Sequence, residues 1–302
     1  MPSERVAEQP EDPARESAPV PTVRATLLGT GTSTGVPVLG CGCDVCTSED
    51  PRDRRLRSSC HLAVRPPGHA GDRNGGAPAV HLQIDTGPDF RRQALDGGID
   101  RVDAVLYTHA HSDHVTGLDD LRPFFFENGA PVPCFARPHT AERLRAAFPH
   151  VFVHDDYPTA ANLTLRELTS ERAPFFAESR YTDDPSPPRV PVEPVPLMHG
   201  ALPTCGFRVG RFAYLTDASA IPEPSFAQLE GRVDTLVIDA LHRRDHPTHF
   251  SIEEATQAAR RIGARRTFFT HLTHSVRHAD EEPRLPEGVH LAYDGLQLTV
   301  GR

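Results

Sequence analysis

Three histidines and one aspartate lie within six consecutive residues of this chain, His109-Ala110-His111-Ser112-Asp113-His114. The motif directly follows an apolar run over 102–107, which is typical of a strand that ends in a tight loop. Neutral imidazole offers a nitrogen lone pair at physiological pH, so histidine is the commonest metal ligand. His109 and His111 can bind one ion, while Asp113 and His114 can reach a second ion close by. The motif therefore predicts a hydrolase that uses two metal ions.

Composition limits the classes of protein that the chain can belong to. Its 302 residues are enough for one large domain or for two halves around a shared core. No apolar run approaches the roughly 18–20 residues that cross a bilayer, and the first residues contain no apolar signal segment. We therefore expect a cytoplasmic protein with no membrane partner. All 32 basic residues are arginine, which excludes a Schiff-base lysine mechanism.

The formal net charge of −9 argues against a nucleic-acid partner, because non-specific binding of that kind needs cationic side chains against the phosphates. A local basic pocket is still compatible with this charge.

The chain divides into a short tail and one long domain. Residues 1–22 are rich in Pro, Glu and Ala, which predicts a disordered tail. A single hydrolase domain is expected over 23–302. Within it, strands are predicted at 24–29, 80–85, 102–107, 131–136, 191–197, 205–209, 212–216, 234–239, 265–270 and 289–300. Helices are predicted at 88–96, 114–122, 139–148, 223–230 and 251–262.

The order of these elements favours an α/β fold with four layers. Strands outnumber helices and both occur in each half, so we expect two sheets packed face to face with helices outside, an αββα sandwich. The helix over 251–262 should begin with a capping box formed by Ser251 and Glu254. Segments 65–78 and 172–190 are rich in Gly, Pro and charge, which predicts mobile loops.

Further candidate ligands stand directly after predicted strands. His199, Asp217 and His271 each follow an apolar run, and Asp85 precedes a glycine turn. Taken singly, a histidine after a strand is more often a surface residue, and aspartate near glycine is common in turns. Together with the 109–114 motif, their order along the chain predicts a shared site, because converging strand ends bring distant residues together.

These residues carry a resemblance to a known group of proteins. The strand followed by Thr-His-Ala-His-Ser-Asp-His, and then His199, Asp217 and His271, resembles the metallo-β-lactamase fold superfamily over roughly residues 24–300. The resemblance implies the αββα sandwich. It also implies His109, His111 and His199 on the first metal, Asp113, His114 and His271 on the second, and Asp217 between them. Asp85 would hold the ligand loop in position from behind.

A cysteine cluster predicts a separate zinc site. Cys41, Cys43 and Cys46 are spaced so that three sulfurs can face one ion, and a tetrahedral structural site needs a fourth ligand. His274, three residues after His271, is our candidate. The alternative is a reduced thiol loop without metal. Cys60, Cys134 and Cys205 are expected to be small buried residues.

The glycine-rich segment 29–37 and the cysteine loop carry a narrower resemblance. With the pair His271 and His274 and the sequence Tyr293-Asp294-Gly295, they resemble the phosphoribosyl cyclic phosphate phosphodiesterases of the carbon–phosphorus lyase pathway. This resemblance implies two catalytic divalent ions, manganese or zinc, together with one structural zinc held by three cysteines and a histidine. Dimers are common in that group, so a homodimer is an open alternative here.

The implied reaction is hydrolysis of a small phosphodiester, cyclic or open, by a hydroxide that bridges the two ions. His249 matches a histidine of this group that contacts phosphate and can act as general acid, so His249 and Asp113 are the predicted catalytic residues. His242 and His246 share the loop of His249, and a solvated polar loop is the simpler interpretation for at least one of the three. Arg55 and Arg57 could contact substrate phosphate, although we expect both at the surface.

Three other functions share this fold. A tRNA 3′-processing endonuclease uses the same ligands but needs an arm or a basic surface for tRNA. A thioester or lactone hydrolase would not need the cysteine loop or His249. A non-hydrolytic protein of cofactor biosynthesis, similar to the B component of the pyrroloquinoline quinone pathway, would carry an altered catalytic site, whereas the ligand set here is complete.

Overall fold

The computed structural model describes residues 20–67, 79–152, 162–182 and 185–301. Most of the predicted tail therefore lies outside the described residues, as does most of the predicted loop 65–78. The first strand begins at Thr22, one residue earlier than the predicted domain, because Thr22 pairs with Arg65 of the neighbouring strand. No helix of the described ranges has the length and apolar composition needed to span a membrane.

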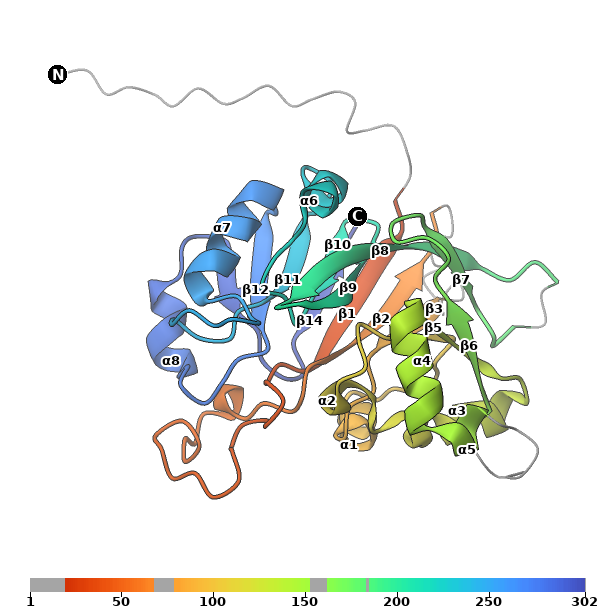
Figure 1. Cartoon of the computed structure of the whole chain (residues 1–302), viewed down its shortest axis with the longest axis horizontal. Helices are drawn as coiled ribbons and strands as arrows, with labels where there is room; N and C mark the ends of the chain where they lie inside the picture. Colours follow the sequence, from red (N-terminus) through yellow and green to blue (C-terminus); the bar gives the residue numbers. More distant parts are fainter. Residues whose placement is uncertain (1–19, 68–78, 153–161, 183–184, 302) are drawn as a thin grey trace, which may run out of the picture.

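Two seven-stranded sheets pack face to face and form the middle of the molecule (Figure 1). The first sheet has the order β14-β1-β2-β3-β4-β5-β6, with β1 Thr22–Gly29, β2 Ser59–Arg65, β3 Val80–Ile84, β4 Ala104–Leu106, β5 Val132–Ala136, β6 Leu163–Glu167 and β14 Gln297–Val300. The second has the order β13-β12-β11-β10-β9-β8-β7, with β7 Phe175–Glu178, β8 Arg189–His199, β9 Leu202–Val209, β10 Phe212–Leu215, β11 Thr235–Asp239, β12 Arg266–Thr270 and β13 Val289–Leu291.

Helices cover the outer faces of the sheets. Those of the first sheet are α1 Phe90–Asp96, α2 Ser112–Val115, α3 Arg122–Asn128, α4 Pro138–Ala147 and α5 Pro149–Phe152, and those of the second are α6 Glu223–Leu229, α7 Ile252–Ile262 and α8 His278–Glu281. Short 3-10 helices occupy Pro51–Asp53, Leu118–Leu121 and Glu282–Arg284. The predicted αββα sandwich is confirmed, and Ser251 and Glu254 form the predicted capping box of α7.

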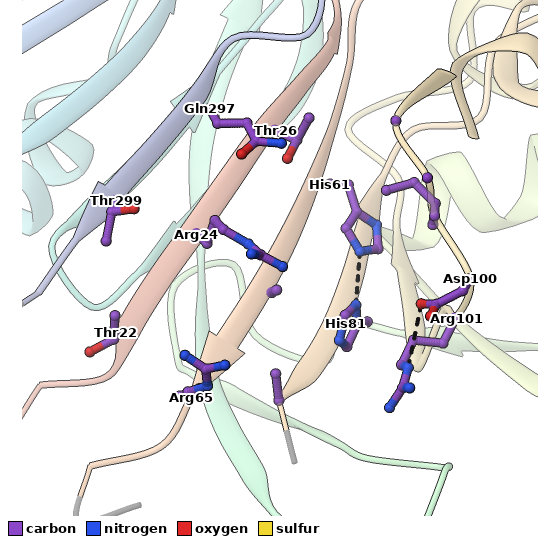
Figure 2. A pocket seen from close by; sticks show the side chains of 15 residues that line it. Thr22, Arg24, Thr26, His61, Arg65, His81, Asp100, Arg101, Gln297 and Thr299 are labelled. Carbon is purple, nitrogen blue, oxygen red and sulfur yellow. Dashed lines mark hydrogen bonds and ion pairs between the residues drawn. The ribbon is translucent and has the colours of Figure 1, made fainter. Parts of the chain in front are cut away.

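Part of the first sheet carries no helix over its outer face. Most outward side chains of β14, β1 and β2 are polar and include Thr22, Arg24, Thr26 and His61 (Figure 2). The inward side chains of the same strands alternate with them and are apolar, as expected for strands with one buried face.

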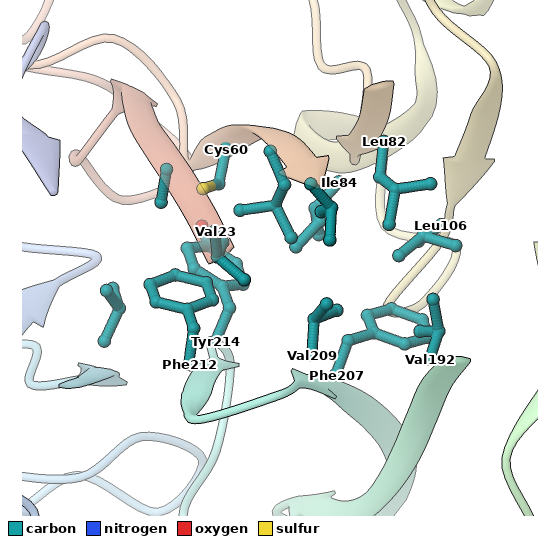
Figure 3. Packing of buried hydrophobic residues seen from close by; sticks show 14 of the residues in the cluster. Val23, Cys60, Leu82, Ile84, Leu106, Val192, Phe207, Val209, Phe212 and Tyr214 are labelled. Atoms are coloured by element: carbon teal, nitrogen blue, oxygen red, sulfur yellow. The ribbon is translucent and has the colours of Figure 1, made fainter. Parts of the chain in front are cut away.

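Three apolar layers follow from this alternation. Side chains from both sheets meet in the central layer, among them Leu82, Leu106, Phe207 and Tyr214 (Figure 3). A second layer packs β10, β11 and β12 against α6 and α7, and a third packs β4 and β5 against the helices of the first half. Cys60, Cys134 and Cys205 are buried, as predicted.

The topology brings strand ends together at one edge. Strands β3 to β6 run parallel to one another, and so do β10 to β13, with helices crossing between many of them. In such sheets, loops after the carboxyl ends of the strands gather at one side, where sites form.

Several predicted elements were wrong in detail. The strand predicted at 289–300 is two strands in different sheets, because Gly295, with a φ of 86°, turns the chain between β13 and β14. The predicted loop 172–190 contains β7, which pairs with the start of β8. The helix predicted at 114–122 is the short α2 followed by a 3-10 helix, and β2 was missed.

The central layer predicts the stability of two matched variants. Leu82 is fully buried between the sheets, so Leu82→Ala should lower the free energy of unfolding by about 2–5 kcal/mol. Leu95 on α1 is 64% exposed, and Leu95→Ala should change it by less than about 0.5 kcal/mol. Urea unfolding of the metal-loaded variants measures both values, and equal losses would contradict this description of the core.

Candidate metal centre

The seven predicted ligands of the two-ion site come from the ends of four strands. The loop after β4 carries His109, His111, Asp113 and His114, and β8 ends at His199. His271 follows β12 directly, and Asp217 is the second residue after β10. The structure brings all seven together at the edge where the two sheets meet.

The backbone is strained at three of the strand ends. Asp85, Asp217 and His271 have φ values of 56°, 53° and 62°, and no other non-glycine residue in the described ranges has a positive φ. This left-handed conformation costs of order 1–3 kcal/mol per residue and collects at functional sites. Here it turns the chain sharply just after β3, β10 and β12.

Four of the seven side chains form one tight group. The donor atoms of Asp113, His114, Asp217 and His271 all lie within 4.8 Å of one another. The Nε2 atom of His114 is 3.1 Å from Asp217 Oδ2 and 3.3 Å from Asp113 Oδ2, and Nε2 of His271 is 3.3 Å from Asp217 Oδ1. Nitrogen and oxygen atoms therefore point at a common centre.

The other three histidines form an adjoining group. The rings of His109 and His111 have centroids 4.5 Å apart, and His199 lies 5.7 Å and 5.2 Å from them. Nε2 of His109 is 3.8 Å from Asp217 Oδ1. Asp217 thus lies between the two groups, in contact distance of both.

Buried atoms without partners show that the site fits metal ions. Nε2 of His109, His114 and His271 is buried in each case and makes no hydrogen bond within the described part of the chain. A buried polar atom without a partner costs about 1–3 kcal/mol, so such atoms need a ligand. Imidazole nitrogens grouped with carboxylates are the donors that zinc and manganese accept.

Polar groups behind the ligands fix their tautomers. His114 donates its Nδ1–H to Asp85 Oδ2 at 2.7 Å, and His199 donates its Nδ1–H to the carbonyl of Thr248 at 2.7 Å. Each bond leaves the Nε2 lone pair free for a metal. Asp85 also accepts from the amide of Thr108 at 2.9 Å and from its hydroxyl at 2.8 Å, so it holds the ligand loop as well.

Charges in the site are strongly coupled. Burial opposes ionisation of Asp217, yet His114 and His271 lower its pKa well below the usual value. Burial likewise opposes a charge on His114, but the carboxylates of Asp217 and Asp85 raise its pKa well above the usual value. Burial lowers the pKa of His109 well below its usual value, which leaves a neutral ring. The pKa of each of these groups therefore depends on its neighbours in the site.

His249 lies beside this group and is held by a residue that the sequence analysis missed. Its Nδ1 is 2.8 Å from Asp239 Oδ2, and its ring is 4.5 Å from His199 and 4.6 Å from His271. Asp239 ends β11 after four buried residues, which is the same pattern that identified Asp217. His246 is exposed with its ring 5.3 Å from His249, as expected for a polar loop.

The prediction that Arg55 lies at the surface was wrong. Its side chain is 1% exposed and donates to Asp53 and to the carbonyls of Thr273 and Val276, which are distant in the sequence. Arg55 therefore joins the cysteine-loop region to the loop of His271 and is not free for substrate. Arg57 is partly exposed and pairs with Asp89 at 3.1 Å.

The cysteine loop forms a second compact donor group. Nδ1 of His274 is 3.3 Å from the sulfur of Cys41 and 3.5 Å from the sulfurs of Cys43 and Cys46. Tetrahedral zinc, with bonds of about 2.3 Å to sulfur and about 2.0–2.1 Å to nitrogen, requires about 3.5 Å between those atoms. The Cys46 amide lowers the pKa of Cys43 to about 6, while burial raises the pKa of Cys46 to about 11. The distances within the group therefore fit zinc.

Metal content tests both groups. We expect purified protein to hold about three ions per chain. Cys43→Ser should lower this to about two and Asp217→Ala to about one, because each change removes a donor from a different group. Mass spectrometry of the dialysed proteins measures the ratio. His150→Ala, a histidine outside both groups, should keep all three ions, and an unchanged ratio in Asp217→Ala would contradict the assignment.

Comparison with known proteins agrees with this geometry. The family model of the beta-lactamase superfamily domain matches residues 81–272. The chain is 37% identical, with a TM-score of 0.76, to the crystal structure of a new diphosphatase from the PhnP family, over 91% of this chain and 97% of that one.

Curated proteins are similar as well. An octanoyltransferase of Porphyromonas gingivalis is 37% identical over 92% of this chain, which spans only 52% of that protein. A ribonuclease Z of Mycobacterium bovis is 30% identical over 68% of this chain and 80% of its own length. From the matched family model, the shared fold and the gathered ligand motif, we conclude that this chain belongs to the metallo-β-lactamase superfamily, whose members are generally metal-dependent hydrolases.

Proposed function

We propose that this protein hydrolyses a small phosphodiester, cyclic phosphates included, at two divalent ions. The observation that carries the proposal is the complete donor set on both sides of Asp217, with the His249–Asp239 pair beside it. A thioester or lactone hydrolase has no evident need for that pair, and a non-hydrolytic relative would not need every donor.

In this proposal each donor group holds one ion. His109, His111 and His199 would hold the first ion, and Asp113, His114 and His271 the second, with Asp217 shared by both. Manganese or zinc suits these nitrogen and oxygen donors. One zinc ion suits the separate group formed by Cys41, Cys43, Cys46 and His274. When bound, a pair of such ions supplies a nucleophile at neutral pH and stabilises charge on phosphoryl oxygens.

His249 is placed to move a proton. Its Nδ1–H is donated to the Asp239 carboxylate at 2.8 Å, which fixes the orientation of the ring. Protonated His249 would then donate from Nε2 to the oxygen that leaves phosphorus, and would regain a proton from solvent. Asp239 is thus a positioning residue, whose carboxylate also accepts from the amide of Ala218 at 2.9 Å.

A small cavity beside His109 and His111 suits a compact anionic substrate. A cavity of about 90 Å³ is lined by His109, His111, His139, Arg143 and Pro203, among others. His139 and Arg143 lie one turn apart on α4, and both are exposed. Arg143 would offer a counter-charge to a second anionic group of the substrate.

The relatives support phosphorus chemistry. The 37%-identical structure is that of a diphosphatase of the PhnP family, and ribonuclease Z is a second phosphodiester-cleaving candidate favoured by 30% identity over most of its length. The net charge of −9 favours the small substrate over tRNA.

His249→Ala should lower kcat for a ribose cyclic phosphate by about 10²–10⁴-fold, because the alkoxide that leaves phosphorus loses its proton donor. Metal content should stay unchanged. His246→Ala is the matched control on the same loop and should retain turnover within about threefold. Equal activity of His249→Ala and wild type would rule out the proton-transfer role.

A substrate panel separates the two phosphodiester candidates. Manganese- or zinc-loaded protein should cleave a ribose cyclic phosphate with a kcat/KM at least about tenfold above that for a tRNA precursor, because no counter-charge for extended RNA is expected. Chromatography of the products measures both rates. Faster cleavage of the tRNA precursor would favour the ribonuclease Z function instead.

A further inference from the structure

A second cavity lies on the outer face of the first sheet (Figure 2). Its volume is about 630 Å³, which is within the usual range for small-molecule sites. Strands β14, β1, β2 and β3 form its floor, and residues 97–101 after α1 form a wall. None of the predicted metal ligands lines it.

Strand register creates the hollow. Thr299, Arg24, Ala63 and His81 lie side by side on four neighbouring strands. Ala63 is the smallest of the four and lies between Arg24 and His81. The floor is therefore low at Ala63 and is bordered by an arginine on one side and a histidine on the other.

The cavity is positively charged, although the whole chain carries −9. Arg24, Arg65 and Arg101 line it, and Asp100 is the one acidic residue among the described residues that line it. Asp100 pairs with Arg101 at 3.5 Å. Within the described ranges, Arg24 and Arg65 make no ion pair, so two guanidinium groups are available for an anion.

A histidine pair on β2 and β3 determines whether the floor of the cavity donates or accepts a hydrogen bond at His81. His61, only 4% exposed, has its Nε2 3.0 Å from Nδ1 of His81 and its Nδ1 3.3 Å from Oε1 of Gln83. Gln83 Nε2 donates to Ser59 Oγ at 2.7 Å and to the carbonyl of Asp85 at 2.8 Å. Oε1 of Gln83 is therefore the acceptor, and His61 carries its hydrogen on Nδ1.

The position of the hydrogen on His61 determines the position of the hydrogen on His81. Burial lowers the pKa of His61 to about 3 and the pKa of His81 to about 4, so both rings are neutral at pH 7. With Nδ1 of His61 protonated, its Nε2 must accept from Nδ1–H of His81. His81 Nε2 then carries a lone pair and can accept a hydrogen bond from a ligand.

We propose that this cavity binds a nucleoside monophosphate. Arg24 and Arg65 would bind the phosphate, because guanidinium groups match phosphate oxygens and need no bound metal. Nε2 of His81 would accept a hydrogen bond from a sugar hydroxyl. This contact would favour a nucleotide over inorganic phosphate. The volume of about 630 Å³ leaves room for the base beside residues 97–101. The proposal does not depend on the reaction at the metal centre.

Calorimetric titration of the metal-loaded full chain with adenosine 5′-monophosphate tests the proposal. Arg24→Glu should weaken binding at least tenfold, because it replaces a phosphate donor with a negative charge. Ala63→Leu should weaken it similarly by filling the floor without changing charge. Arg91→Glu, an exposed arginine on α1 outside the cavity, carries the same charge change and should alter binding less than twofold. The 2′,3′-dideoxy analogue should bind wild type several-fold more weakly.

Turnover of bis(p-nitrophenyl) phosphate provides the folding control, since all three variants should match wild type within about twofold whether or not the nucleotide binds. Unchanged affinity in both Arg24→Glu and Ala63→Leu would place any bound nucleotide at the metal centre and overturn the proposal. Arg24-dependent binding of a single-stranded oligonucleotide without binding of the mononucleotide would also overturn it, in favour of an RNA surface.

Discussion

A buried carboxylate among imidazole rings is the interaction on which the rest of this structure depends. Asp217 is 2% exposed and lies within 3.8 Å of nitrogens from His109, His114 and His271. An unpaired buried charge costs several kcal/mol, so Asp217 is compatible with folding only where these rings, or cations held by them, surround it. Because the rings come from both sheets, this requirement fixes how the two sheets meet.

The need to gather the ligands around Asp217 also explains the backbone strain at the ends of β3, β10 and β12. Asp85, Asp217 and His271 adopt the left-handed conformation, which unstrained strands avoid. Close backbone packing adds to this, since a Cβ on Gly87 would lie 2.0 Å from the carbonyl of Asp113. The loop of ligands and the turn after β3 are therefore pressed together, and only glycine fits at that contact.

Local patterns were enough to predict most of the candidate site. The 109–114 motif and the residues after apolar runs identified each proposed ligand, and the sandwich followed from the order of elements. Asp239 was missed because an aspartate at the end of a strand is common, and only its contact with His249 distinguishes it. The strand predicted at 289–300 was wrong for a similar reason. β13 and β14 are both partly apolar, and the sequence does not reveal that they pair in different sheets.

Long-range contacts explain what the sequence could not predict. Arg55 is buried because the carbonyls of Thr273 and Val276, more than 200 residues away, accept its hydrogen bonds. The basic cavity likewise exists only through the register that aligns Arg24, Ala63 and His81. Neither arrangement leaves a periodic signal in the chain.

Anomalous diffraction from crystals of the metal-loaded protein, recorded at the absorption edges of manganese and zinc, tests the central claim most directly. We predict two peaks about 3.5–4 Å apart on either side of Asp217, and a separate zinc peak among Cys41, Cys43, Cys46 and His274. A single peak at the histidine motif, or none near Asp217, would contradict this account.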